Sequence, residues 1–189
     1  RFLELCGVTD DRETLKEAAL YAENLWRESE KEVPKEAGQW RRNQISLKEK
    51  DAILFLSGDW ESIYQQYKGI SRSLGWTSDP KGVIVPLFLL GLYDGQRLQK
   101  AGLNMFKDTC CKLGMYSINE DWNQNLFENW KKIYRFSEEE SSRYLSWGQT
   151  EVEQRVAGIV ENSFRKSYGK AAILVAGFGE VMESRGEEN

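Results

Sequence analysis

The longest nearly apolar run in the chain is Val83–Tyr93, which reads VIVPLFLLGLY and is bounded by turn-forming residues on both sides. At 11 residues the run is much shorter than the roughly 20 that a membrane-spanning helix needs, so it predicts a segment of the protein core. We expect a short helix over Pro86–Tyr93, buried on most faces, with Pro86 in the first turn, where proline is tolerated. A buried strand over Val83–Val85 is the alternative.

Apolar residues elsewhere recur at the three- and four-residue spacing of amphipathic helices. This spacing predicts helices over residues 11–32, 47–56, 60–74, 96–113, 118–135, 138–147 and 151–168, with 171–183 either a helix or a short strand. The first of these helices has an apolar stripe formed by Leu15, Ala18, Ala19, Ala22, Leu25, Trp26 and Ser29.

The pattern therefore predicts an all-α fold, a single irregular multi-helix globular domain of about eight or nine helices around a buried central helix. We expect one domain over residues 1–189, with an N-terminal helical lobe at 1–78 and a C-terminal helical lobe at 79–189 as a possible subdivision.

Helix-start signals support this interpretation. In a capping box, a Ser, Thr or Asp side chain accepts a backbone N–H bond and a Glu three residues later bonds back to the amide of the capping residue. Five pairs fit this pattern: Asp10 with Glu13, Ser46 with Glu49, Ser117 with Glu120, Ser137 with Glu140, and Thr150 with Glu153. We expect each to begin a helix, with Gly148 separating two of them.

The chain contains no histidine, which excludes Ser-His-Asp triads and Cys-His pairs within it. Its three cysteines, Cys6, Cys110 and Cys111, provide neither a zinc-binding spacing nor a disulfide framework, and they favour a reducing compartment, the cytoplasm or nucleus. We accordingly expect no cofactor, no catalytic residues and no membrane partner. An enzyme that uses carboxylates and a divalent metal stays an alternative.

Charge is distributed unevenly along the chain. Residues 1–36 have a net charge of −4, residues 37–136 of +4 and residues 137–189 of −4. Such an arrangement is compatible with head-to-tail self-association, with an internal interface, or with a basic face on the middle part of the chain, although mixed charge on helix surfaces explains it equally well.

Three short stretches combine aromatic and basic residues, the composition of grooves that bind single-stranded nucleic acid. Their cations are candidate binding residues, together with the tryptophan of the first stretch: Trp40, Arg41, Arg42, Lys131, Lys132, Arg135, Arg165 and Lys166. Trp130 and Phe164 also fall on predicted core stripes, and in that structural interpretation the neighbouring cations are merely solvated.

We expect a non-catalytic helical module that binds a macromolecule, with a protein partner or copies of itself first. The alternative is a nucleic-acid-binding domain, such as a nucleoprotein or replication-type domain, that uses the basic middle third.

Overall fold

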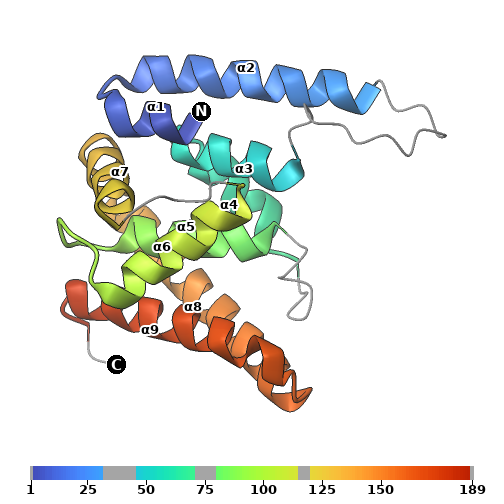
Figure 1. Ribbon diagram of the computed structural model, residues 1–189, viewed down its shortest axis with the longest axis vertical. Coiled ribbons are helices and arrows are strands. Elements are labelled where there is room, and N and C mark those ends of the chain that lie inside the picture. Colours follow the sequence, from blue (N-terminus) through green and yellow to red (C-terminus); the bar gives the residue numbers. More distant parts are fainter. Residues whose placement is uncertain (1, 32–45, 71–79, 115–119, 188–189) are drawn as a thin grey trace.

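The computed structural model describes residues 2–31, 46–70, 80–114 and 120–187, and every regular element in these ranges is a helix (Figure 1). The elements are α1 (Phe2–Val8), α2 (Arg12–Lys31), α3 (Leu47–Leu56), α4 (Trp60–Tyr67), α5 (Lys81–Leu92), α6 (Lys100–Lys112), α7 (Glu120–Ile133), α8 (Glu138–Glu161), the 3₁₀ helix η1 (Arg165–Ser167) and α9 (Tyr168–Ser184). The all-α prediction is confirmed.

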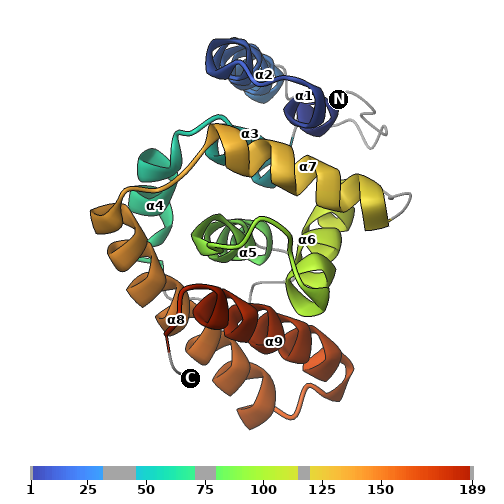
Figure 2. The same cartoon turned by 90° about the vertical axis from the view of Figure 1, so that its left-hand side faces the viewer.

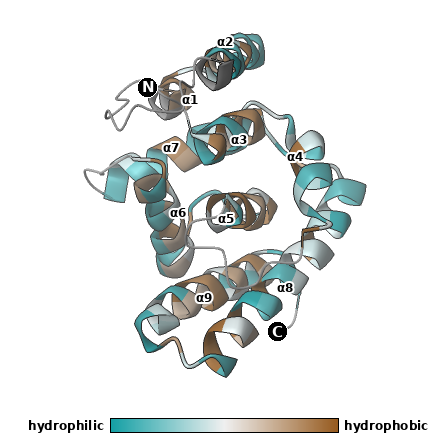
Figure 3. Ribbon diagram, turned by 90° about the vertical axis from the view of Figure 1, so that its right-hand side faces the viewer, coloured by the Kyte–Doolittle hydropathy of each residue, from teal (hydrophilic) through white to brown (hydrophobic). Residues whose placement is uncertain are grey.

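Helix α5 lies at the centre of the fold, and all of its residues are buried. It packs against α3, α6, α8 and α9, and Figure 2 shows it inside a ring formed by α3, α4 and α6–α9, with α1 and α2 outside the ring. In Figure 3 much of the α5 ribbon has the colour of hydrophobic residues. Because apolar side chains cover its whole circumference, α5 is stabilised by burial on every face. The described elements form one globular domain around it.

The predicted start of this central helix is wrong. The helix begins at Lys81 rather than Pro86, so Val83–Val85 is helical and Pro86 lies in the helix interior. Proline has no N–H, which leaves the carbonyl four residues earlier, that of Gly82, without its helical donor. The Nζ atom of Lys112 on α6 donates to this carbonyl at 2.9 Å, so a side chain replaces the missing backbone bond.

Aromatic rings fill the space on one side of α5. The ring of Phe88 lies 4.7 Å from that of Phe55 on α3, and 4.8 and 5.1 Å from those of Tyr144 and Trp147 on α8, measured between centroids. Edge-to-face pairs of this kind add about 0.5–1.5 kcal/mol each beyond the area they bury. They join α3, α5 and α8 into one core.

Two of the predicted capping boxes are confirmed, at Ser46 with Glu49 and at Ser137 with Glu140. The start of α2 is displaced by one residue, because Asp11 rather than Asp10 accepts bonds from the amides of Glu13 and Thr14. Ser117 lies outside the described residues.

The predicted break at Gly148 is wrong, since α8 runs without interruption from Glu138 to Glu161. Gly148 is buried, and a Cβ atom there would lie 2.8 Å from Cδ2 of Leu89, so the glycine allows α5 to approach closely. Thr150 therefore lies inside the helix, where its hydroxyl donates to the carbonyl of Ser146 at 3.0 Å.

Other helix boundaries also differ from the prediction, such as the start of α6, which is Lys100 rather than residue 96. Helix α4 ends at Tyr67, so residues 68–70 are not helical, and α8 ends at Glu161 rather than continuing to 168. The ambiguous segment at 171–183 is helical and belongs to α9. No helix among the described residues has the length and apolarity needed to cross a membrane.

Candidate functional site

Those predicted binding residues that the structure describes do not form a single groove. Trp40, Arg41 and Arg42 lie outside the described residues. Lys131 and Lys132 lie in the last turn of α7 and Arg135 lies two residues beyond it, whereas Arg165 and Lys166 form part of η1. Arg185, just after α9, lines the same cavity as Lys131, Lys132 and Arg135, whereas η1 lies at the other end of α9. Helix α9 has 17 residues and is therefore about 25 Å long, which separates the two groups of cations.

The α7 cations line a cavity of about 420 Å³, which we call the basic pocket. Four parts of the chain form its walls. They are the end of α5 with the residues after it (91–96), the end of α7 with the segment after it (Glu128, Lys131, Lys132, Arg135 and Phe136), Ser141 near the start of α8, and Arg185 after α9. Helices α5, α7 and α9 all end beside the pocket, and residues at or after each of these ends line it.

Lys131 is the most deeply placed cation of the basic pocket. Its Nζ donates to the carbonyl of Gly91 at 2.7 Å, which satisfies one of the free carbonyls in the last turn of α5. Burial lowers the pKa of Lys131 to about 8, Arg135 and Arg185 lower it further, and Asp94 acts in the opposite direction. Lys131 is therefore surrounded by more positive than negative charge.

Some charges of the basic pocket are neutralised within the structure. The Nε atom of Arg185 lies 2.9 Å from Oε1 of Glu187, and the Nε atom of Arg97 lies 3.4 Å from Oε1 of Glu128. Arg135 is exposed and forms no hydrogen bond or ion pair with any residue that the structure describes, and Lys132 donates only to the side chain of Asn129 at 3.1 Å.

The aromatic residues beside these cations belong to the core. Trp130 is buried and donates from Nε1 to the backbone carbonyl of Leu56 at 3.1 Å. The buried Tyr134 donates from its hydroxyl to the backbone carbonyl of Ser57 at 2.7 Å. Neither ring can stack on a base. Two other aromatic residues line the basic pocket, the buried Tyr93 and the half-buried Phe136, and Phe136 contributes an apolar wall.

The cluster around Phe164 has a different environment, and the expectation that Phe164 lies on a core stripe is wrong. Helix α8 ends at Glu161, and Ser163 adopts a left-handed conformation with φ of 54°, which takes Phe164 out of the helical register. Its side chain is 49% exposed. Most side chains of this turn are exposed, Glu161, Asn162 and Ser163 among them. We call its exposed apolar and basic residues the basic tip: Val160, Phe164, Arg165, Lys166, Tyr168 and Lys170.

A second exposed apolar group lies on α2, on the side opposite the apolar stripe, and it was not predicted from the sequence. Leu20 and Tyr21 are 59% and 66% exposed. At 100° per residue they share the face opposite the buried stripe with acidic and amide residues. We call this the acidic face, formed by Glu13, Glu17, Leu20, Tyr21, Asn24 and Glu28.

The acidic face and the basic tip lie at opposite ends of the long axis of the molecule (Figures 1 and 2). On the acidic face, Glu13 is paired with Lys16 at 2.8 Å, while Glu17 and Glu28 form no ion pair within the described part of the chain. On the basic tip, three exposed cations are accompanied by one exposed carboxylate, that of Glu161.

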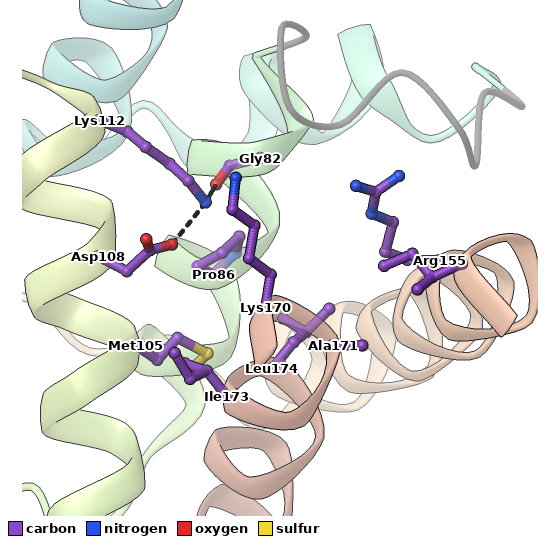
Figure 4. A pocket seen from close by; sticks show the side chains of 11 residues that line it. Gly82, Pro86, Met105, Asp108, Lys112, Arg155, Lys170, Ala171, Ile173 and Leu174 are labelled. Atoms are coloured by element: carbon purple, nitrogen blue, oxygen red, sulfur yellow. Dashed lines mark hydrogen bonds and ion pairs between the residues drawn. The ribbon is translucent and has the colours of Figure 1, made fainter. Parts of the chain in front are cut away.

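A smaller cavity of about 40 Å³ lies between α5, α6, α8 and α9 (Figure 4). Figure 4 shows Lys112 reaching the Gly82 carbonyl and Asp108, which lies 2.6 Å from it. This space has room for a water molecule or two and is too small for an organic ligand. We regard the site as structural.

The described residues contain no group of three His, Cys, Asp or Glu side chains that could hold a metal ion. Burial raises the pKa of the Cys6 and Cys110 thiols to about 12, so both stay protonated near neutral pH. Cys111 is exposed. Thiolate chemistry at neutral pH is thus excluded at Cys6 and Cys110.

Comparison of the chain with protein-family models, with curated proteins and with solved structures finds no significant match.

Proposed function

We propose that the chain is a non-catalytic helical module that binds copies of itself head to tail, with the acidic face of one copy docked on the basic tip of the next. The observation that supports this proposal is the pair of exposed apolar groups at opposite ends of the molecule, which are flanked by charges of opposite sign.

The apolar part of each surface supplies the driving force for association. Leu20 and Tyr21 on one surface, and Phe164 and Tyr168 on the other, are each between 43% and 66% exposed. Removing such side chains from water is favourable by about 25 cal/mol per Å² of apolar area, before the entropic cost of association is subtracted. A small contact of this kind gives weak, concentration-dependent association.

The charges supply orientation. Glu17 and Glu28 form no ion pair within the described residues of their own chain, and Arg165 and Lys166 on the tip are exposed. Opposite charges attract the two surfaces, whereas two acidic faces or two basic tips repel each other. The contact is therefore heterologous, and a heterologous contact produces a closed ring or an open filament.

The test is a complementation experiment with one variant for each surface. Leu20→Lys places a cation in the centre of the acidic face, and Phe164→Glu places a carboxylate in the centre of the basic tip. We expect sedimentation velocity to show that the mass of the unaltered chain increases with concentration, and less steeply at high salt. Each variant alone should stay monomeric, while an equimolar mixture should form a dimer that grows no further.

The matched control is Leu47→Lys, which makes the same change at a side chain that is 42% exposed on α3 and belongs to neither surface. It should associate like the unaltered chain. A constant mass of one chain at every concentration would overturn the proposal. So would dimers formed by each variant alone, because they would indicate a symmetric contact.

A further inference from the structure

We infer that the basic pocket binds a small phosphate-bearing molecule of about the size of a nucleotide or a sugar phosphate. The inference is independent of self-association, because the basic pocket shares no residue with the acidic face or the basic tip. Its volume of about 420 Å³ lies within the range of about 300–1,000 Å³ that is common for small-molecule sites.

The charge of the basic pocket favours an anion. Two of its charged residues are already paired, Arg185 with Glu187 and Glu128 with Arg97. Three cations, Lys131, Lys132 and Arg135, then face one further carboxylate of the lining, that of Asp94. The surplus of two positive charges matches a phosphate dianion.

Helix ends alone do not account for this surplus. The C-terminal ends of α5, α7 and α9 carry partial negative charge and favour nearby cations. Lys131 fulfils this role at α5 through its bond to the Gly91 carbonyl. Arg135 lies beyond the last residue of α7 and bonds to no carbonyl within the described structure, so its guanidinium is available to a ligand.

The rest of the lining suits the organic part of such a ligand. The guanidinium of Arg135 offers the paired N–H donors that fit phosphate oxygens. Phe136 gives an apolar wall, and Ser141 adds a hydroxyl from the first turns of α8. The Asp94 carboxylate can accept a bond from a ligand hydroxyl or amine, which inorganic phosphate alone does not offer.

The experiment measures binding by titration calorimetry at low salt with three probes: adenosine 5′-monophosphate, adenosine and inorganic phosphate. We expect the monophosphate to bind most tightly, inorganic phosphate more weakly, and adenosine not at all. The double variant Lys132→Gln, Arg135→Gln should weaken binding of the monophosphate at least tenfold. Both side chains are exposed, so the fold should be retained.

The matched control is Arg165→Gln, Lys166→Gln, which removes the same charge from exposed residues of the basic tip. It should bind the monophosphate as the unaltered chain does. Equal weakening by both double variants would show a nonspecific charge effect and overturn the inference. A fourth titration, with a single-stranded oligonucleotide, separates the two sources of phosphate. If the oligonucleotide binds and the monophosphate does not, the inference is overturned and the pocket instead favours a nucleic-acid backbone.

Discussion

The Nζ atom of Lys81 lies 2.6 Å from Oε1 of Glu151, and the two side chains are 0% and 7% exposed. The pair connects the first residue of α5 to the middle of α8. A cation at a helix N-terminus opposes the helix dipole, and a buried charge loses its hydration. The carboxylate of Glu151 compensates for both effects, and Lys81 also donates to the carbonyl of Ile70.

We expect Glu151→Gln to lower the free energy of unfolding by about 2–4 kcal/mol, because it leaves a buried cation without its carboxylate. The double variant Lys81→Met, Glu151→Leu should recover most of this loss, since it removes both charges. Urea denaturation followed by tryptophan fluorescence measures the change. Glu13→Gln is the control, because its ion pair with Lys16 is exposed on both sides and should be worth less than about 1 kcal/mol. Equal effects of the two glutamine variants would contradict the prediction.

Pro86 and Lys112 should be energetically coupled. Lys112→Met removes the donor that replaces the missing N–H of Pro86, so it should destabilise the protein by about 1–3 kcal/mol. In a Pro86→Ala background the same change should cost less, because the new backbone N–H can reach the Gly82 carbonyl. A double-mutant cycle of unfolding free energies measures the coupling. Additive effects would show that the Lys112 bond does not compensate for the proline.

Gly91 and Gly169 should respond to alanine in opposite directions. A Cβ atom at Gly91 would lie 2.6 Å from the ring of Phe136, whereas one at Gly169 would meet no atom within 4 Å. We expect Gly91→Ala to lower the melting temperature, with a cost of about 1–3 kcal/mol from overpacking. Gly169→Ala in the first turn of α9 should raise the melting temperature slightly, because alanine stabilises a helix by up to about 1 kcal/mol relative to glycine. A melting temperature unchanged in both variants would refute the close approach of α5 to Phe136.

The three thiols should differ in their reaction with Ellman's reagent. Cys111 is exposed and should react rapidly in the folded protein, whereas Cys6 and Cys110 are buried and should react only as the protein opens. In denaturant all three should react together. Absorbance recorded over time counts the fast and slow groups, and Cys111→Ala should remove the fast phase alone. A fast phase from two thiols would place Cys6 or Cys110 at the surface.

Stability should fall at alkaline pH. Burial raises the pKa of Cys6, Cys110 and Tyr134 to about 12 each. In the unfolded chain these groups lose protons at lower pH, so the stability that they provide is complete below about pH 9 and is lost as the pH rises toward 12. Lys131 has the opposite effect. Because its pKa is lowered to about 8, its contribution to stability increases as the pH rises from about 8 to 10.5, but it is a single group against three.

Unfolding free energies measured from pH 7 to 11 test this expectation. We expect a decrease of a few kcal/mol, and a shallower decrease in Cys110→Ala, since one unit of pKa shift corresponds to about 1.36 kcal/mol. Stability that stays constant over this range would contradict the buried positions of these groups.

The elements that the sequence predicted correctly are those governed by local physics. Ser46 and Ser137 cap helices through contacts within four residues, and the buried members of the α2 stripe, such as Leu15 and Ala19, follow from helical spacing alone. The central position of α5 follows from apolar residues on every face.

The errors occur where a distant segment decides the outcome. Pro86 lies inside α5, where Lys112 from another helix donates to the carbonyl that the proline leaves without a backbone donor. Gly148 lies inside α8, where Leu89 of α5 occupies the space that a side chain would take. The basic pocket joins residues from four separate parts of the chain, and Arg185 could not be associated with Lys131 from spacing. The exposure of Leu20 and Tyr21 on α2 could have been predicted from the sequence, because both lie opposite the apolar stripe on a helical wheel.

The position of α5 also has a consequence for the order in which the fold can be completed during synthesis. Its partner α3 precedes it, but α6, α8 and α9 follow it, and the last of these ends at Ser184. A ribosome would therefore expose the most apolar helix of the chain for the time needed to make about 90 further residues, some 5–20 s at typical rates. During that interval α5 is the segment that we expect chaperones to bind.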